Sequence, residues 1–126
     1  MKKIITTDKA PAPIGPYNQA VLLGNLLYTS GQIAINPKTG ALEIDDIEKE
    51  TKLVMENLKA ILEEAGMTFE NVIKSSIFVS DMHNFSKINK VYGQYFNAET
   101  APARETVEVA NLPKFVNVEI SVIASC

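Results

Sequence analysis

The architecture of this chain follows from one segment, Val116-Asn117-Val118-Glu119-Ile120-Ser121-Val122-Ile123-Ala124. Every second residue from Val116 to Ala124 is apolar, whereas Asn117, Glu119 and Ser121 are polar. Successive side chains of a β-strand point to opposite faces of a sheet, so the alternation predicts a strand with one buried and one polar face. The apolar row must therefore be buried against a second layer of structure.

Two upstream segments are predicted to supply that layer as helices. From Asp46 to Ala65 apolar residues recur at spacings of three and four, the period of an amphipathic helix. We expect Asp45 or Asp46 to cap this helix and Gly66 to end it. A second, shorter helix is marked by Phe85, Ile88, Tyr92 and Phe96.

Further strands are predicted on both sides of the helices. Two apolar runs, 17–23 and 26–32, flank Gly24-Asn25, which favours a hairpin with a two-residue turn. Residues 72–80 are rich in β-branched side chains, and Ile73, Ile77 and Val79 are expected on one face. Residues 106–110 form the next expected strand.

This order of elements predicts an α+β fold, a mixed sheet with two helices packed on one face. A chain of 126 residues has room for one domain of ordinary size, so we expect a single domain over residues 1–126. No element is left to cover the other face of the sheet. We therefore predict self-association through that face.

Composition narrows the classes of function. The net charge is −3 and the lysines are scattered, so a nucleic-acid partner is not indicated. No apolar run is long enough to cross a bilayer, and Met1–Ile5 does not lead into a signal peptide, so we expect a cytoplasmic location. The single cysteine, Cys126, allows no internal disulfide or four-cysteine zinc site, and the single histidine, His83, is expected at an exposed helix start.

Arg104 is the leading candidate for a binding residue, because it is the only arginine beside eleven lysines. Bidentate recognition of a carboxylate needs the planar guanidinium, whereas a solvated surface charge does not. The residues leave open a structural ion pair with Glu105, Glu108 or Glu119. Alternation places Arg104, Thr106 and Glu108 on one face of the penultimate strand, and we expect this face to be the polar face that carries Glu119.

Weaker candidates lie near the first loop. Ser30-Gly31 offers a hydroxyl and an unshielded backbone N–H that could hold an oxygen of a small anion, although such a pair commonly only turns a chain. Tyr17 follows the rigid Ile14-Gly15-Pro16 corner, and core packing is the alternative for it. The simplest interpretation of Asn89 is an amide on the protein surface. Considered by itself, Glu119 is most simply interpreted as a solvated residue of a strand.

The motifs together resemble one family. They are Ala10-Pro11 with Ile14-Gly15-Pro16-Tyr17, Thr29-Ser30-Gly31-Gln32, Pro102-Ala103-Arg104 with Val107-Glu108-Val109-Ala110, Leu112-Pro113-Lys114, Val118-Glu119-Ile120 and Ile123-Ala124. In this order, over nearly the whole chain, they resemble the Rid proteins, reactive intermediate deaminases also called the YjgF family. One departure is Thr106, where many members carry a cysteine, and a second is Glu105 in place of a small polar residue.

The resemblance implies a chorismate-mutase-like α+β fold and a homotrimer whose sheets form a central barrel with clefts between subunits. Members of the RidA type hydrolyse the imine forms of 2-aminoacrylate and 2-aminocrotonate, the enamine products of pyridoxal-phosphate-dependent dehydratases, to 2-oxo acids and ammonia. By resemblance Arg104 would bind the substrate carboxylate with the Gly31 N–H, and Glu119 would act on the attacking water. Tyr17, Ser30, Asn89 and Thr106 would line the pocket, and no metal or organic cofactor is required.

Two other functions stay open at this point. A trimer that senses 2-oxo acids and regulates a partner protein would use Arg104 in the same way but would not need Glu119 near the reactive carbon. Some relatives are credited with endoribonuclease or translation-inhibitor activity. The acidic net charge and the absence of a histidine pair argue against that activity here.

Overall fold

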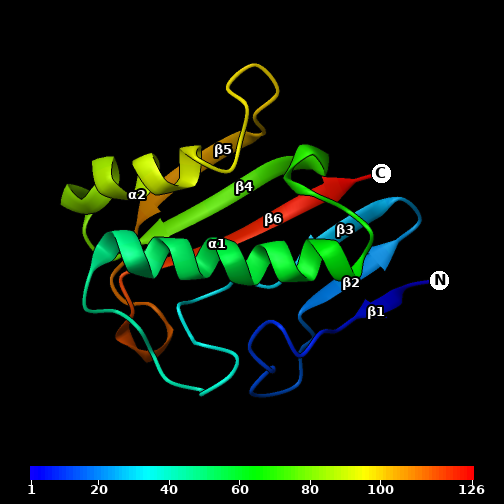
Figure 1. Ribbon diagram of the computed structural model, residues 1–126, viewed down its shortest axis with the longest axis horizontal. Helices are drawn as coiled ribbons and strands as arrows, with labels where there is room; N and C mark the ends of the chain where they lie inside the picture. The colour runs from blue at the N-terminus through cyan, green and yellow to red at the C-terminus, as the bar shows by residue number, and fades with distance from the viewer.

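The computed structural model describes residues 1–126 and contains one six-stranded mixed sheet with two α-helices on one of its faces (Figure 1). The strands lie in the order β1-β2-β3-β6-β4-β5. Their bounds are β1 Lys3–Ile5, β2 Ala20–Leu23, β3 Leu26–Thr29, β4 Val72–Val79, β5 Ala103–Glu108 and β6 Val118–Ser125; the helices are α1 Ile47–Glu64 and α2 Phe85–Gly93. The predicted α+β architecture is thus confirmed.

The long helix α1 begins and ends where the sequence predicts. The Asp46 side chain accepts hydrogen bonds from the backbone N–H groups of Glu48 and Lys49, at 2.9 and 3.1 Å. Just beyond its last turn, Gly66 adopts φ +75°, a left-handed conformation that glycine accepts without a Cβ clash. The inner face of α1 carries Val54, Leu58 and Ile61, all fully buried against the sheet.

Strand β6 lies between β3 and β4 and carries the predicted alternation. Val118, Ile120, Val122 and Ala124 are buried beneath the helices, and the residues between them are partly exposed. The hairpin β2–β3 turns at Gly24-Asn25 as predicted. Strands β4 and β5 pair in parallel and are joined through α2, the β-α-β arrangement that places the helix on the same side as α1.

One residue of β4 departs from the prediction. Ile73 is 50 % exposed, whereas Ile77 and Val79 are buried as expected. The register of β4 against β6 shifts between Val72 and Lys74, so a β-bulge at this point turns Ile73 out of the core. A sequence pattern of period two cannot reveal such an inserted residue.

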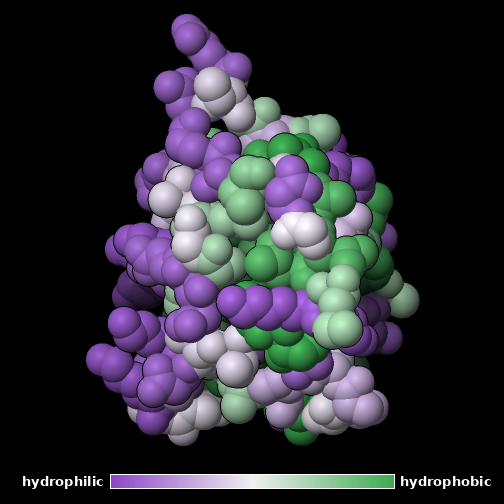
Figure 2. Space-filling view, turned by 90° about the vertical axis from the view of Figure 1, so that its right-hand side faces the viewer, coloured by the Kyte–Doolittle hydropathy of each residue, from purple (hydrophilic) through white to green (hydrophobic).

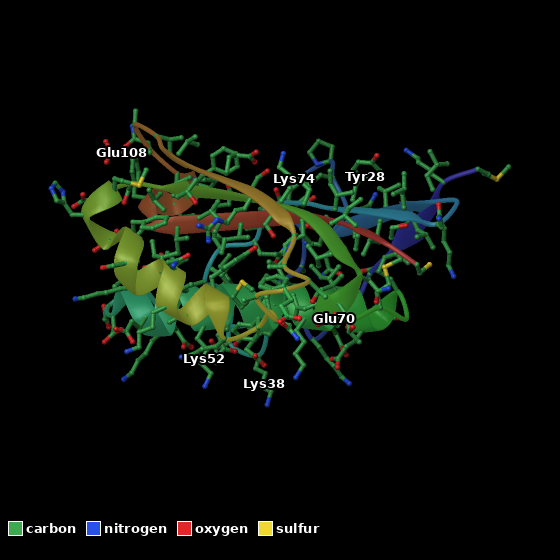
Figure 3. All side chains as sticks on the ribbon, turned by 90° about the horizontal axis from the view of Figure 1, so that it is seen from above. Tyr28, Lys38, Lys52, Glu70, Lys74 and Glu108 are labelled. Carbon is green, nitrogen blue, oxygen red and sulfur yellow. The ribbon has the colours of Figure 1, made fainter.

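The other face of the sheet carries no layer of its own. In Figure 3, Tyr28 and Lys74 project from the side away from the helices, whereas Lys52 projects from the outer side of α1. Tyr28 and Val107 are 47 % and 40 % exposed. Figure 2 shows hydrophilic side chains along one flank of the molecule and apolar side chains gathered on the opposite flank. The open face agrees with the expectation from sequence, while self-association stays a prediction.

Neither helix combines the length and the apolar character that crossing a bilayer demands.

Candidate functional site

A cavity of about 470 Å³ brings four of the predicted site residues together. They are Tyr17, Ser30, Gly31 and Glu119, which come from the first loop, the segment after β3 and the start of β6. The remaining lining residues are Pro11, Ala12, Ile14, Gln19, Gln32, Ile33, Ile35, Pro113 and Lys114. The walls are therefore mostly apolar around a few polar groups, the usual character of a small-molecule site.

A local break in the sheet makes room for Glu119. The Thr29 hydroxyl accepts from the Val122 N–H at 3.0 Å, so a side chain replaces the backbone at this point of the β3–β6 ladder. Backbone pairing returns only at Gln32, whose N–H donates to the Ile120 carbonyl at 2.8 Å. Gly31 lies between, and a Cβ built on it would be 2.7 Å from the Glu119 carboxyl carbon. The Glu119 side chain thus occupies space that exists because residue 31 is glycine.

Glu119 is a half-buried carboxylate without a partner. It takes part in no hydrogen bond or ion pair, and burial raises its pKa. Glu105 differs, because Lys74 at 2.8 Å and the Ser76 hydroxyl bind it and lower its pKa. A carboxylate that is left unpaired in an apolar cavity and inclined to take up a proton is suited to proton transfer.

The loop that walls the cavity is held in a fixed shape. Gln19 is 2 % exposed, and its amide donates to the Thr7 and Pro11 carbonyls, each at 2.9 Å, while it accepts from the Thr7 N–H at 2.7 Å. The Ser30 hydroxyl donates to the Asn18 carbonyl at 2.6 Å. Sequence reasoning missed Gln19; the available signal was the Pro-rich segment 10–16, which begins three residues beyond Thr7. Tyr17 lines the cavity and is 49 % exposed, so its ring is not packed in the core.

Arg104 forms a second group with residues of α2. Its Nη1 donates to the Asn89 Oδ1 at 2.6 Å, and its guanidinium carbon lies 5.6 Å from the ring centre of Phe85 and 5.1 Å from that of Tyr92. The Tyr92 hydroxyl in turn donates to Ser75 at 2.9 Å in the core. The hydrogen bond and the two rings orient the guanidinium. Arg104 nevertheless stays exposed, and its remaining N–H groups are free to donate to a ligand.

The expectation that Arg104 and Glu119 share a sheet face is wrong. Arg104 pairs with Ser75, which is buried beneath the helices, whereas Glu119 pairs with Phe78 on the open face. Strand β4 also separates β5 from β6, so the two polar stripes are not neighbours. Alternation tells which residues of one strand share a face; only the pairing between strands tells which face that is.

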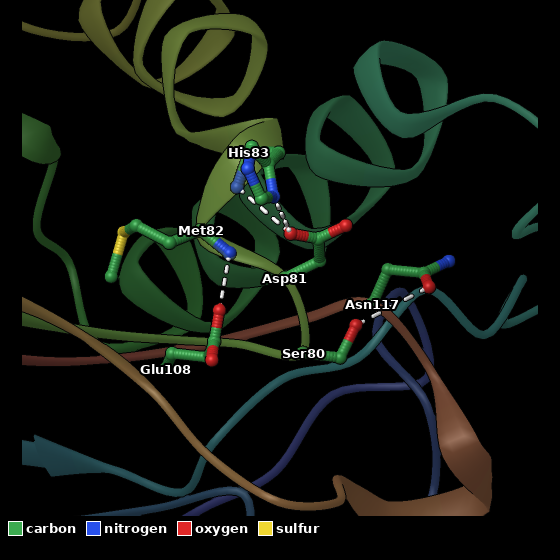
Figure 4. A network of polar contacts seen from close by, with 6 residues as sticks. All are labelled: Ser80, Asp81, Met82, His83, Glu108 and Asn117. Atoms are coloured by element: carbon green, nitrogen blue, oxygen red, sulfur yellow. Dashed lines mark hydrogen bonds and ion pairs between the residues drawn. The ribbon is translucent and has the colours of Figure 1, made fainter.

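The structural ion pair considered for Arg104 is not formed. Glu105 binds Lys74, and Glu108 accepts from the Met82 N–H at 2.7 Å, as Figure 4 shows. The same view shows His83 beside Asp81, and His83 has the exposed position that was predicted at the start of a helical turn. Arg104 is thus a cation without a carboxylate partner.

Thr106 lies on the same face of β5 as Arg104. Its partner in β4 is Ile77, and its hydroxyl oxygen is buried without a hydrogen bond. A buried hydroxyl costs free energy until it finds a partner. In one chain, therefore, Arg104, Asn89 and Thr106 form one group at the edge strand, and Tyr17, Ser30, Gly31 and Glu119 form another in the cavity.

Lys114 is a cavity residue that sequence reasoning did not single out as a site residue. It belongs to the short turn Pro113–Phe115 and has φ +54°, followed by Phe115 at φ +57°. Two successive non-glycine residues in the left-handed region are uncommon, and such strain is often found where a ligand is bound. The signal available in the sequence was the Leu112-Pro113-Lys114 motif.

Comparison with known proteins extends over nearly the whole chain. The family described as Endoribonuclease L-PSP matches residues 7–126. A RutC family protein of Pyrococcus horikoshii is 52 % identical over 124 residues, and the 2-iminobutanoate/2-iminopropanoate deaminase of Salmonella typhimurium is 46 % identical over 126; each alignment covers 98 % of both chains.

A solved structure agrees in shape as well as in sequence. The crystal structure of Escherichia coli TdcF with bound serine superposes with a TM-score of 0.92 at 44 % identity and covers 98 % of both chains. The quoted motifs, the six-stranded sheet with two helices on one face, and these matches lead to the same assignment. The chain belongs to the Endoribonuclease L-PSP family, the Rid or YjgF family of proteins.

Proposed function

We propose that this protein hydrolyses small 2-imino acids, the imine forms of 2-aminoacrylate and 2-aminocrotonate, to 2-oxo acids and ammonia. The observation that carries the proposal is Glu119, an unpaired carboxylate with a raised pKa inside a preformed cavity. The name of the Salmonella typhimurium relative and the serine bound to TdcF support a small amino-acid-like ligand. Glu119 is also the feature that a protein made only to bind a 2-oxo acid would not need.

We infer that each site is shared by two subunits of a homotrimer, in which the open sheet faces meet as a central barrel. The two groups of site residues lie on opposite faces of one sheet, so one copy cannot place both around one small molecule. Arg104 is exposed on the edge strand β5, where a neighbouring copy can reach it. Arg104, Asn89 and Thr106 of one subunit would face Tyr17, Ser30, Gly31 and Glu119 of the next.

The chemistry follows from these groups. Arg104 binds the substrate carboxylate through two parallel N–H donors, and the Gly31 N–H supports the same anion. Glu119 takes a proton from a water molecule as its oxygen adds to the imine carbon, which gives a carbinolamine. Glu119 then returns this proton to the nitrogen. As the C–N bond breaks and ammonia leaves, the hydroxyl proton of the carbinolamine passes to Glu119 and the carbonyl of the 2-oxo acid forms. Proton transfer of this kind typically contributes about 10²–10⁴-fold in rate.

A coupled assay tests the proposal. A serine or threonine dehydratase generates the enamine, and the release of 2-oxo acid is followed with and without this protein. We expect the protein to accelerate release above the spontaneous rate. No acceleration, together with measurable binding of a 2-oxo acid, would instead identify a sensor that regulates a partner protein.

The family description also names an endoribonuclease, and the site offers little for that reaction. Its cavity contains one lysine and no histidine, and the single His83 is exposed beside Asp81. RNA cleavage that survives Arg104→Ala in nuclease-free protein would point to a separate activity at another surface.

Gly31→Ala is expected to lower activity without unfolding the protein. The new methyl carbon would lie 2.7 Å from the Glu119 carboxyl carbon, and the side chain of Glu119 can move away at small cost. Displacing a catalytic group by about 1 Å can lower kcat/KM roughly 10²-fold. The measurement is kcat/KM together with the midpoint of urea unfolding.

Gly93→Ala is the matched control, because nothing lies within 4 Å of a Cβ at this helical glycine. It should keep full activity. If Gly31→Ala also keeps full activity, the position of the Glu119 carboxylate does not matter for the reaction.

A further inference from the structure

The cavity around Glu119 continues into an outer compartment. A second cavity of about 230 Å³ adjoins it and shares with it Pro11, Ala12, Ile14, Ile35 and Lys114. The residues that belong only to the outer compartment are Asn36, Pro37 and Gly40, and none of the proposed catalytic or substrate-binding residues lines it. The two compartments form one groove that runs from the reacting centre to the loop after Ile35.

This groove is larger than the small imino acids need. Cavities of about 300–1,000 Å³ hold drug-sized ligands, and the inner compartment alone is about 470 Å³. The imine of 2-aminoacrylate carries only a single carbon as its side chain. A substrate placed with its imine carbon at Glu119 could therefore extend a longer side chain along Pro11, Ile14 and Ile35, whose apolar surfaces suit methylene groups.

Lys114 is the only cation that lines either compartment, and it lines both. It forms no ion pair within the chain. Glu119 likewise has no ion-pair partner, so the ammonium group of Lys114 is not paired with that carboxylate. The strained turn at Lys114 and Phe115 thus holds an uncommitted positive charge at the junction of the two compartments.

We propose that Lys114 binds an anionic group at the far end of the substrate side chain, and that the preferred substrates include 2-imino dicarboxylic acids. This inference rests on the proposed imine hydrolysis and names its substrate class. Arg104 of the neighbouring subunit binds the α-carboxylate, Glu119 acts at the imine carbon, and Lys114 binds the second carboxylate. The reaction is unchanged, since water adds to the imine carbon and ammonia leaves.

The test compares two side chains of equal length and different charge. An amino-acid oxidase generates the imines of glutamate and glutamine, and semicarbazide traps whatever imine the protein has not hydrolysed. We expect wild type to prefer the acidic imine over its amide by about tenfold or more, the usual size of one charge-assisted contact. Lys114→Met should abolish this preference, and Lys114→Arg should keep it.

Lys52→Met is the control, because Lys52 projects from the outer side of α1 away from the groove. Lys52→Met should leave unchanged the ratio of the hydrolysis rates of the glutamate and glutamine imines. If this ratio is the same in wild type and in Lys114→Met, Lys114 does not have the proposed role, provided that wild type hydrolyses the imine of 2-aminoacrylate. If wild type fails on that small imine, the proposed function itself fails.

Discussion

Arg104→Lys is expected to lose about 10²-fold in kcat/KM, although the variant keeps the positive charge, because hydrogen bonds to charged groups are worth about 1.5–3 kcal/mol. A lysine ammonium is a point charge and cannot offer two parallel donors to a carboxylate. It also cannot stack as a plane on Phe85 and Tyr92, the two rings that orient the guanidinium. Steady-state kinetics in the dehydratase-coupled assay measure the loss.

Arg104→Ala serves as the comparison for this prediction. We expect it to be no more than modestly worse than Arg104→Lys, since both lack the planar fork. Arg104 is exposed and pairs with no carboxylate, so both variants should unfold at nearly the wild-type concentration of urea. Wild-type activity in Arg104→Lys would mean that charge alone binds the substrate, and the bidentate geometry would have to be abandoned.

Much of the fold can be read from local signals in the sequence. The cap at Asp46, the left-handed Gly66 and the Gly24-Asn25 turn each depend on residues within one short segment, and the structure has all three. The alternation in β6 depends only on the chain's own period. Ile73 was misplaced because a bulge adds a residue to one strand, a feature that depends on the partner strand.

The site was harder to predict because it depends on pairing at a distance. Arg104 and Glu119 stand out in the sequence as candidate site residues, but the sheet faces on which they lie follow from the insertion of β6 between β3 and β4. Lys114 lines the cavity through a left-handed turn that no residue type in Leu112-Pro113-Lys114 demands. The motifs thus point to these candidate residues, and only the sheet order shows that one copy of the chain separates them into two groups.

Glu119→Gln is expected to cause the largest loss of activity, about 10²–10⁴-fold in kcat, because the amide cannot accept a proton from water. The substitution keeps the shape of the side chain and therefore leaves Gly31 and the β3–β6 break undisturbed. Binding of a 2-oxo acid product should change far less than kcat. A variant with wild-type kcat would exclude Glu119 as the base.

The pH dependence gives an independent check on the same residue. Burial raises the pKa of Glu119 in the folded protein, so the wild-type rate should rise with pH through a value above that of an ordinary glutamate, and Glu119→Gln should lack this limb. The stability of the fold should change with pH in the opposite direction to the rate. The stability linked to Glu119 is fully present below the pKa of this group in the unfolded chain. It is lost as pH rises through the raised pKa in the folded protein, because the ionised carboxylate is poorly solvated. Glu119→Gln should therefore be at least as stable as wild type at neutral pH.

Mixing the two inactive variants tests whether two subunits share each site. Arg104→Ala chains retain Glu119, and Glu119→Gln chains retain Arg104. If trimers are reassembled from an equal mixture, about one quarter of the interfaces receive both intact residues, and about that share of wild-type activity should return. Within a single chain the two residues lie on opposite faces of the sheet, so a site confined to one copy would recover nothing. Recovered activity would therefore require that two copies of the chain bring the two halves of the site together.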